Sequence, residues 1–172
     1  MSIAERASAL AITPPRTRSC RYEPKVLNVM LEAAAEHDLR VYVSLLLGAD
    51  AGLRRNEILA IRWPDVDFRA KEINVCRNVY HRKDERIETT PKGGVSKRVP
   101  CTPRLLAALR NLHEKRTGAT VLADEGGQPW TPKVLRRAVA RVERVVGLDD
   151  SGRIHVFRHS FASNLCAAGA PP

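Results

Sequence analysis

The segment RIHVFRHSFAS, residues 153–163, places a histidine and two arginines where a helix is expected to begin. It predicts a helix from about His155 to Ala168, with Gly169 just past its end, because glycine commonly follows the last turn of a helix. His155 and Arg158 are three residues apart, so their side chains share one helix face and could reach a common ligand. Taken alone, the pair also fits a hydrogen-bonded core histidine, so its meaning depends on the rest of the chain.

The chain is strongly basic. Its 172 residues include 29 lysines and arginines against 19 aspartates and glutamates, a formal net charge of +10, and 44% of the residues are hydrophobic. This length and composition suit one compact globular domain with a sizeable core. The excess positive charge is typical of a protein that meets a polyanion, so we expect a nucleic acid as the partner. A generic basic surface is the alternative.

The cysteines are scattered, with no Cys-x-x-Cys pair and no histidine at metal-ligand spacing; they are Cys20, Cys76, Cys101 and Cys166. Neither a zinc site nor a disulfide framework is indicated, and reduced thiols point to the cytoplasm. No apolar run approaches the roughly 18 residues of a membrane span, and the N-terminus lacks the apolar core of a secretory signal. We therefore expect a cytoplasmic protein without a membrane partner.

Helical patterns dominate the chain and predict a mainly helical α+β domain. Residues 1–21 fit a basic N-terminal arm or linker remnant, ahead of a folded domain over residues 22–172. Apolar spacing and proline starts predict further helices over residues 24–38, 39–52, 54–63, 102–116 and 131–147. Pro64 is expected to end the third of these. Short β-branched stretches predict one small antiparallel sheet over residues 72–101, with Gly93-Gly94 as a hairpin turn between its second and third strands.

The helix predicted over residues 131–147 has two different faces and closes at Gly147. Its apolar stripe comprises Leu135, Ala138, Val139, Val142 and Val146. Arginines lie largely off that stripe, at positions 136, 137, 141 and 144. Such a face is often simply solvated, but on so basic a chain we name Arg136 and Arg137 as candidate DNA contacts.

Three stretches occur in a telling order: AGLRRNEILAIRW (51–63), TPKGGVSKRVP (90–100) and HVFRHSFAS (155–163). Together they resemble the catalytic domain of tyrosine recombinases, the phage integrase family, over about residues 22–170. The resemblance implies the fold of that catalytic domain. For a full-length parent it implies DNA integration and site-specific recombination, in which DNA strands are cut and rejoined through a 3′-phosphotyrosine.

The resemblance also implies four catalytic residues. The family's Gly-Leu-Arg box falls on residues 52–54 and its His-x-x-Arg box on residues 155–158, so Arg54 and Arg158 would clamp a phosphate. Paired guanidinium donors match the non-bridging oxygens of a phosphodiester, where negative charge accumulates during attack. The family's hairpin lysine falls on Lys92, which would protonate the departing 5′ oxygen, and His155 would assist proton movement.

Two supporting residues follow from the same match. The family's acidic position falls on Glu57, which would orient or neutralise an arginine of the clamp, and His159 extends the His-x-x-Arg box. No metal ion or other cofactor is expected, because cations of the protein take the place of a metal at the phosphate. Taken alone, Lys92 would be interpreted as an exposed turn lysine.

The nucleophile implied by the resemblance has no counterpart in this sequence. In the family, the His-x-x-Arg helix is followed by the tyrosine that attacks DNA, whereas Tyr22, Tyr42 and Tyr80 all lie upstream of the box. We expect this chain not to cleave DNA by itself, since the covalent intermediate requires a nucleophile. A full-length recombinase protomer could donate the tyrosine, and the isolated chain is expected to be a monomer.

Two other functions stay open. One is a non-catalytic DNA-binding or regulatory module derived from an integrase, which needs the fold but no nucleophile. The other is a helical protein-interaction domain whose basic boxes are coincidental, which the ordered match of three motifs disfavours. Steeply salt-dependent binding to DNA would be expected of the module, and a flat response would eliminate it.

Overall fold

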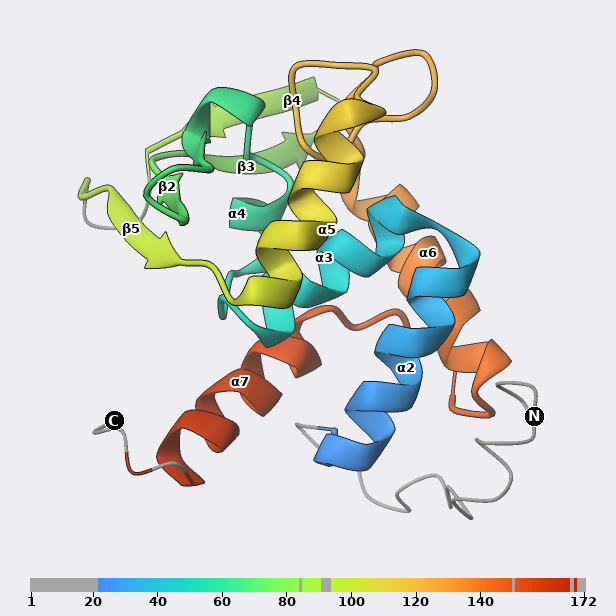
Figure 1. The fold of residues 1–172 in the computed structure, drawn as a ribbon. Helices are drawn as coiled ribbons and strands as arrows, with labels where there is room; N and C mark the ends of the chain where they lie inside the picture. Colours follow the sequence, from blue (N-terminus) through green and yellow to red (C-terminus); the bar gives the residue numbers. More distant parts are fainter. Residues whose placement is uncertain (1–21, 84, 91–93, 150, 168, 170–172) are drawn as a thin grey trace.

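A computed structural model describes residues 22–83, 85–90, 94–149, 151–167 and 169. The predicted N-terminal arm lies outside these residues, and so do Lys92 and Gly93 of the predicted hairpin. The described chain is mainly helical, with short antiparallel strands gathered at one end (Figure 1), which confirms the predicted α+β class. Within these ranges, no helix combines the length and the apolar character needed to cross a membrane.

Helix α3 (Leu39–Ala49) lies in the middle of the helical part (Figure 1). From Val41 to Ala49, Tyr42 alone is not buried, which explains the nearly continuous apolar sequence of this helix. Asp38 separates α3 from the preceding helix, since its extended backbone ends one helix and its carboxylate accepts the N–H of Arg40 at 2.7 Å. Helix α3 contacts α2 (Pro24–His37), α5 (Pro103–Glu114), α6 (Pro132–Val145) and α7 (His155–Ala167).

Helices α5 and α6 begin and end as their sequences predict. Thr102 Oγ1 accepts the N–H of Leu105 at 3.3 Å, and Thr131 Oγ1 caps α6 in the same way. After α6, Gly147 has a φ of +75°, a conformation that a side chain would strain. The predicted start of α7 at His155 and the glycine beyond its end are confirmed as well.

The third predicted helix is wrong in length. Helix α4 spans only Arg55–Ile58, and Pro64 lies inside a separate 3₁₀ helix, η1 (Trp63–Asp65), rather than at the end of a helix. Between the two, Arg62 forms an isolated antiparallel bridge with Thr120. The apolar residues of this stretch are all buried, so their spacing reflects burial rather than a continuous helix; they are Ile58, Leu59, Ala60, Ile61 and Trp63.

The single predicted sheet is also wrong. Strands β1 (Val66–Asp67), β2 (Glu72–Val75) and β5 (Lys97–Pro100) form one three-stranded sheet in the order β1-β2-β5. Strands β3 (Asn78–Arg82) and β4 (Glu85–Thr89) form a separate two-stranded sheet. The predicted strand 72–80 therefore breaks at residues 76–77, and the two strands expected to pair across Gly93-Gly94 pair with β3 and β2 instead.

Candidate functional site

Segments far apart in the sequence meet around an open cavity of about 830 Å³. They are the start of α4, the start of β3, the first turn of α6, and residues 151–159, which lead into α7. The predicted residues that line it are Arg54, Arg136, His155, Arg158 and His159. Arg55 and Arg153 add two further cations, so the cavity attracts anions strongly.

The main chain of the Gly-Leu-Arg box holds Arg158 at the cavity. Arg158 Nη1 donates a hydrogen bond to the carbonyl oxygen of Gly52. Gly52 has a φ of +63°, and a Cβ there would lie 2.5 Å from the ring of Phe161 on α7. Only glycine permits both the conformation and the close approach. The hydrogen bond and this contact therefore hold the two boxes side by side, although Gly52 and Arg158 are 106 residues apart.

Arg54 reaches the cavity from just before α4, with 64% of its side chain exposed. Its backbone N–H donates to Glu57 Oε2 at 2.7 Å, and its Nη1 lies 3.3 Å from Glu57 Oε1. Burial alone would raise the pKa of Glu57, but the hydrogen bond from Arg54 and the charge of Lys97 outweigh it and lower that pKa below its ordinary value. Glu57 is therefore a buried, charged carboxylate that contacts both the backbone and the side chain of Arg54.

Lys97 is a residue of the site that the sequence did not single out. It comes from β5, and its Nζ lies 3.2 Å from each carboxylate oxygen of Glu57. The signal that could have found it is the alternation of its strand, which places Lys97 and Val99 on the inward face and Arg98 on the outward one. Its partner Glu57 is 40 residues away in the sequence, and no local sequence pattern predicts that the two residues form an ion pair.

His155 begins α7, and His159 follows one turn later, with ring centroids 5.9 Å apart. Partial burial lowers the pKa of His155, and electrostatic interaction with His159, Arg153 and Arg55 lowers it further. The imidazole is therefore neutral near pH 7, the form that can accept a proton.

A buried carboxylate on α6 braces the loop that leads into α7. Glu143 is completely buried and accepts hydrogen bonds from Tyr22 Oη at 2.7 Å, Ser151 Oγ at 3.0 Å and the N–H of Gly152 at 2.6 Å. The Tyr22 ring packs edge-on against Phe157 of α7, with centroids 5.3 Å apart. Glu143 and Tyr22 thus fix the segment that delivers the His-x-x-Arg box.

Tyr22, Tyr42 and Tyr80 lie outside the lining of the 830 Å³ cavity. Burial and the hydrogen bond to Glu143 raise the pKa of Tyr22 far above its ordinary value. Tyr42 is half-buried against the core, and Tyr80 is exposed on β3. Of the described residues that line the cavity, none is a tyrosine.

The predicted DNA contacts on α6 extend the basic surface away from the cavity. Arg137 lies with Arg136, Arg141 and Arg144 around a second hollow of about 520 Å³ on the outer side of the helix. Because Arg136 lines both hollows, the two basic surfaces are continuous. The apolar stripe on the opposite face is confirmed, with Leu135, Val139, Val142 and Val146 buried.

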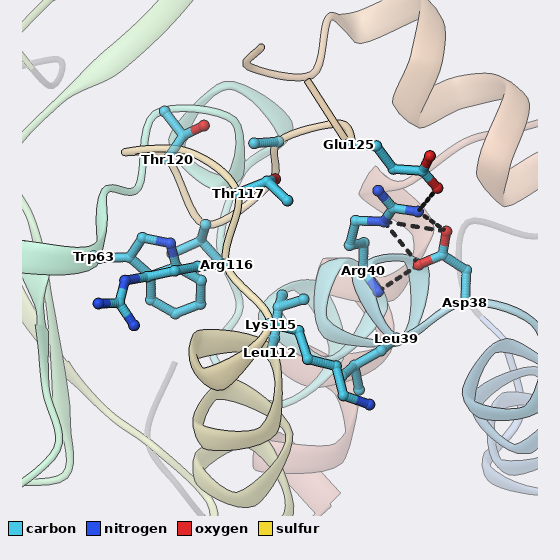
Figure 2. A pocket seen from close by; sticks show the side chains of 12 residues that line it. Asp38, Leu39, Arg40, Trp63, Leu112, Lys115, Arg116, Thr117, Thr120 and Glu125 are labelled. Atoms are coloured by element: carbon cyan, nitrogen blue, oxygen red, sulfur yellow. Dashed lines mark hydrogen bonds and ion pairs between the residues drawn. The ribbon is translucent and has the colours of Figure 1, made fainter. Parts of the chain in front are cut away.

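A smaller cavity of about 260 Å³ lies between the start of α3, the end of α5 and the loop that follows α5. Figure 2 shows Arg40 on one side of it, turned toward Asp38 and Glu125, with Trp63 on the other side. None of the described residues around it belongs to the predicted site, so we treat it as separate.

The 830 Å³ cavity can hold an anion between guanidinium groups and has a neutral imidazole at its rim. Planar guanidinium donors suit tetrahedral oxyanions such as phosphate. In the part of the chain that the structure describes, no cluster of three or more His, Cys, Asp or Glu side chains could hold a metal ion. The cationic side chains that line the cavity are arginines of the start of α4, of α6 and of the segment that leads into α7.

Comparison with protein families and curated sequences gives a consistent result. The family model described as "Phage integrase family" matches residues 21–172. A "Tyrosine recombinase XerC-like" protein of Caldanaerobacter subterraneus is 28% identical over 165 residues, covering 81% of this chain and 41% of the relative. A "Tyrosine recombinase XerC" of Mesorhizobium japonicum is 31% identical over 133 residues, covering 74% and 38%. The chain spans less than half the length of these relatives.

Solved structures share the fold. The Tn1549 transposon integrase in complex with circular intermediate DNA superposes with a TM-score of 0.79 at 18% identity, covering 91% of this chain and 57% of that one. The XerA recombinase superposes with a TM-score of 0.73 at 19% identity, covering 92% and 54%.

Proposed function

Because the chain belongs to the phage integrase family, we propose that it forms the DNA-binding catalytic-domain portion of a site-specific tyrosine recombinase. The two relatives described above are tyrosine recombinases, and one similar structure is a transposon integrase in complex with DNA. The proposed partner is double-stranded DNA, which fits the net charge of +10. The proposed place of action is the cytoplasm.

One observation carries the proposal: Arg54, His155 and Arg158 come from two distant boxes and line the same cavity. A lone arginine on a surface binds phosphate weakly, whereas two guanidinium groups on opposite sides of one phosphate offer paired, charge-assisted donors. The bond from Arg158 to Gly52 supports this role, because it fixes the spacing of the two boxes before DNA arrives. A preorganised clamp avoids reorganisation when charge develops on the phosphate.

In the proposed reaction a tyrosine hydroxyl attacks the clamped phosphorus, and a 3′-phosphotyrosine bond forms as the bond to the 5′ oxygen breaks. The leaving oxygen takes a proton from Lys92, and neutral His155 assists the transfer of the tyrosine proton. Glu57 orients Arg54, and His159 supports His155. The roles of Lys92 and of the tyrosine rest on the family, since Lys92 lies outside the described residues.

Contacts with the flanking phosphates are proposed for α6. Arg136 and Arg137 lie on the surface that continues from the clamp, within reach of a polyanion that extends past the cavity. Such contacts give affinity without sequence readout.

The clamp is tested by measuring the affinity of the chain for a short labelled duplex by fluorescence anisotropy. Replacing Arg54 or Arg158 by alanine should weaken binding about tenfold or more, the usual effect of losing a hydrogen bond to a charged group. Arg69→Ala is the matched control, because Arg69 is exposed and lies in the turn after β1. Unchanged affinity in both clamp variants would count against the proposal.

A second candidate function is favoured by the tyrosine positions: a module that binds DNA and pairs with an intact recombinase. Tyr22 is bound to Glu143, and of the described residues that line the cavity none is a tyrosine. The two candidates differ in whether the clamp of this chain takes part in cleavage. They are separated by mixing this chain and a nicked duplex with a full-length protomer that keeps its tyrosine but has its own clamp arginines replaced by alanine, followed by denaturing electrophoresis. A covalent complex that forms only when this chain is present would exclude the module, and no complex would favour it. Sedimentation of the isolated chain should show the proposed monomer.

A further inference from the structure

The buried carboxylate of Glu57 has two cationic partners, and the second of them has no place in the reaction described above. We propose that Lys97 is a positioning residue that keeps Arg54 available to phosphate by neutralising Glu57. The inference rests on the proposed function, because it concerns the strength of the same clamp. Lys97 contacts the carboxylate and acts through it.

Lys97 contacts the Glu57 carboxylate more extensively than the Arg54 side chain does. Lys97 Nζ lies 3.2 Å from both oxygens of Glu57, whereas Arg54 places only Nη1 near it, at 3.3 Å. The Glu57 side chain is 7% exposed and the Arg54 side chain 64% exposed. Most of the guanidinium therefore stays outside the ion pair, on the cavity side.

The charge of Lys97 determines how strongly Glu57 attracts Arg54. With Lys97 in place, Arg54, Glu57 and Lys97 together carry one net positive charge next to the cavity. Without Lys97, Arg54 and Glu57 form a neutral pair, and a buried carboxylate with no other cation draws the guanidinium toward itself. A phosphate would then have to compete with Glu57 for Arg54.

The strand that carries Lys97 has a fixed register. In the β2–β5 pairing Lys97 lies opposite Val75, and Val99 lies opposite Ile73, which is completely buried. A slip of one residue would turn Val99 outward and Lys97 away from Glu57, so burial of the apolar side chains maintains the contact.

The neighbouring residue provides a matched control. Arg98 occupies the outward face of the same strand and lies 3.6 Å from Glu72 rather than near Glu57. Arg98→Gln removes the same charge from the next position. It therefore corrects for the general loss of positive charge on the chain.

The test measures how much Arg54 contributes to DNA affinity. For each background, the dissociation constant of a short labelled duplex is measured with and without Arg54→Ala, and the ratio of the two constants is the contribution of Arg54. In the unchanged chain and in Arg98→Gln the ratio should be about tenfold or more. In Lys97→Gln it should shrink to about twofold or less, because Arg54 is already held by Glu57. Adding Glu57→Gln to Lys97→Gln should restore it, since the amide oxygen can still accept the N–H of Arg54 but carries no charge.

The outcomes separate the inference from the function on which it rests. If Arg54→Ala changes nothing in the unchanged chain, the clamp and the inference both fail. If it weakens binding equally with and without Lys97, the clamp stands and the inference is overturned. The inference is also overturned if the ratio stays small in the double variant Lys97→Gln/Glu57→Gln. That result would show that Lys97 acts through its own contact with DNA. Should Lys97→Gln not unfold cooperatively, the double variant and Lys97→Arg, which keeps the charge and should keep the ratio, carry the test.

Discussion

His155 lies among cations at the rim of the cavity, which makes its protonation sensitive to a bound anion. Partial burial and electrostatic interaction with His159, Arg153 and Arg55 lower its pKa below the ordinary value of 6.5. The unfolded chain therefore takes up the proton first as the pH falls. The contribution of neutral His155 to stability is complete above 6.5 and is lost as the pH falls through the lower folded-state pKa.

We predict that binding of duplex DNA raises the pKa of His155, because a phosphate between the arginines offsets the surrounding positive charge. By linkage, affinity for DNA rises as the pH falls through the folded-state pKa. Titration of the ring protons by NMR, with and without a short duplex, measures the shift, and His155→Gln should remove that part of the pH dependence. A pKa that DNA leaves unchanged would place the phosphate away from His155.

The residues that the sequence predicted and those it missed differ in how their partners are arranged. Arg54, His155 and Arg158 belong to short boxes, and all three line the same cavity. Lys97 was missed because its partner Glu57 lies 40 residues away. Glu143 was missed because Tyr22 lies 121 residues away and its other two partners lie in the loop after α6, so only tertiary structure joins them. An isolated glutamate on an arginine-rich helix looks like a solvated charge, yet Glu143 is completely buried.

Among the elements, α7 depends on the brace made by Tyr22 and Glu143. We predict that Tyr22→Phe costs about 1–3 kcal/mol of unfolding free energy, because it leaves the buried Glu143 carboxylate one hydrogen bond short while keeping the ring against Phe157. Urea unfolding measures the loss, and the amide of Gly152 should exchange faster with solvent. Tyr80→Phe is the control, since Tyr80 is 42% exposed. Equal stability of the two variants would contradict the brace.

Element boundaries were predictable where local chemistry sets them. Threonine caps and proline starts fix α5 and α6, and Gly147 fixes the end of α6. Strand pairing was not predictable, because alternation identifies a strand without naming its neighbour. The stretch 72–80 has one continuous strand-like pattern, yet its halves join different sheets after a break at Cys76 and Arg77.

For the molecule as a whole, the distribution of positive charge, rather than its total, indicates where a polyanion would bind. The net charge of +10 predicted a polyanionic partner but not a surface. The fold concentrates arginines around two hollows that share Arg136, while the opposite face of α6 is buried in the core. A polyanion is therefore expected to run from the clamp along α6 rather than to bind evenly over the surface.

This arrangement predicts a change in salt dependence. If Arg136 and Arg137 each neutralise one phosphate, replacing both by glutamine should reduce the slope of log affinity against log salt by about 1.8, because each neutralised phosphate contributes about 0.9. Anisotropy titrations between low and physiological salt give the slope, and Lys replacements at both positions should preserve it, since the charge remains. Arg69→Gln controls for the general loss of charge. A slope that the double glutamine variant leaves unchanged would confine DNA to the clamp and leave the outer face of α6 a solvated surface.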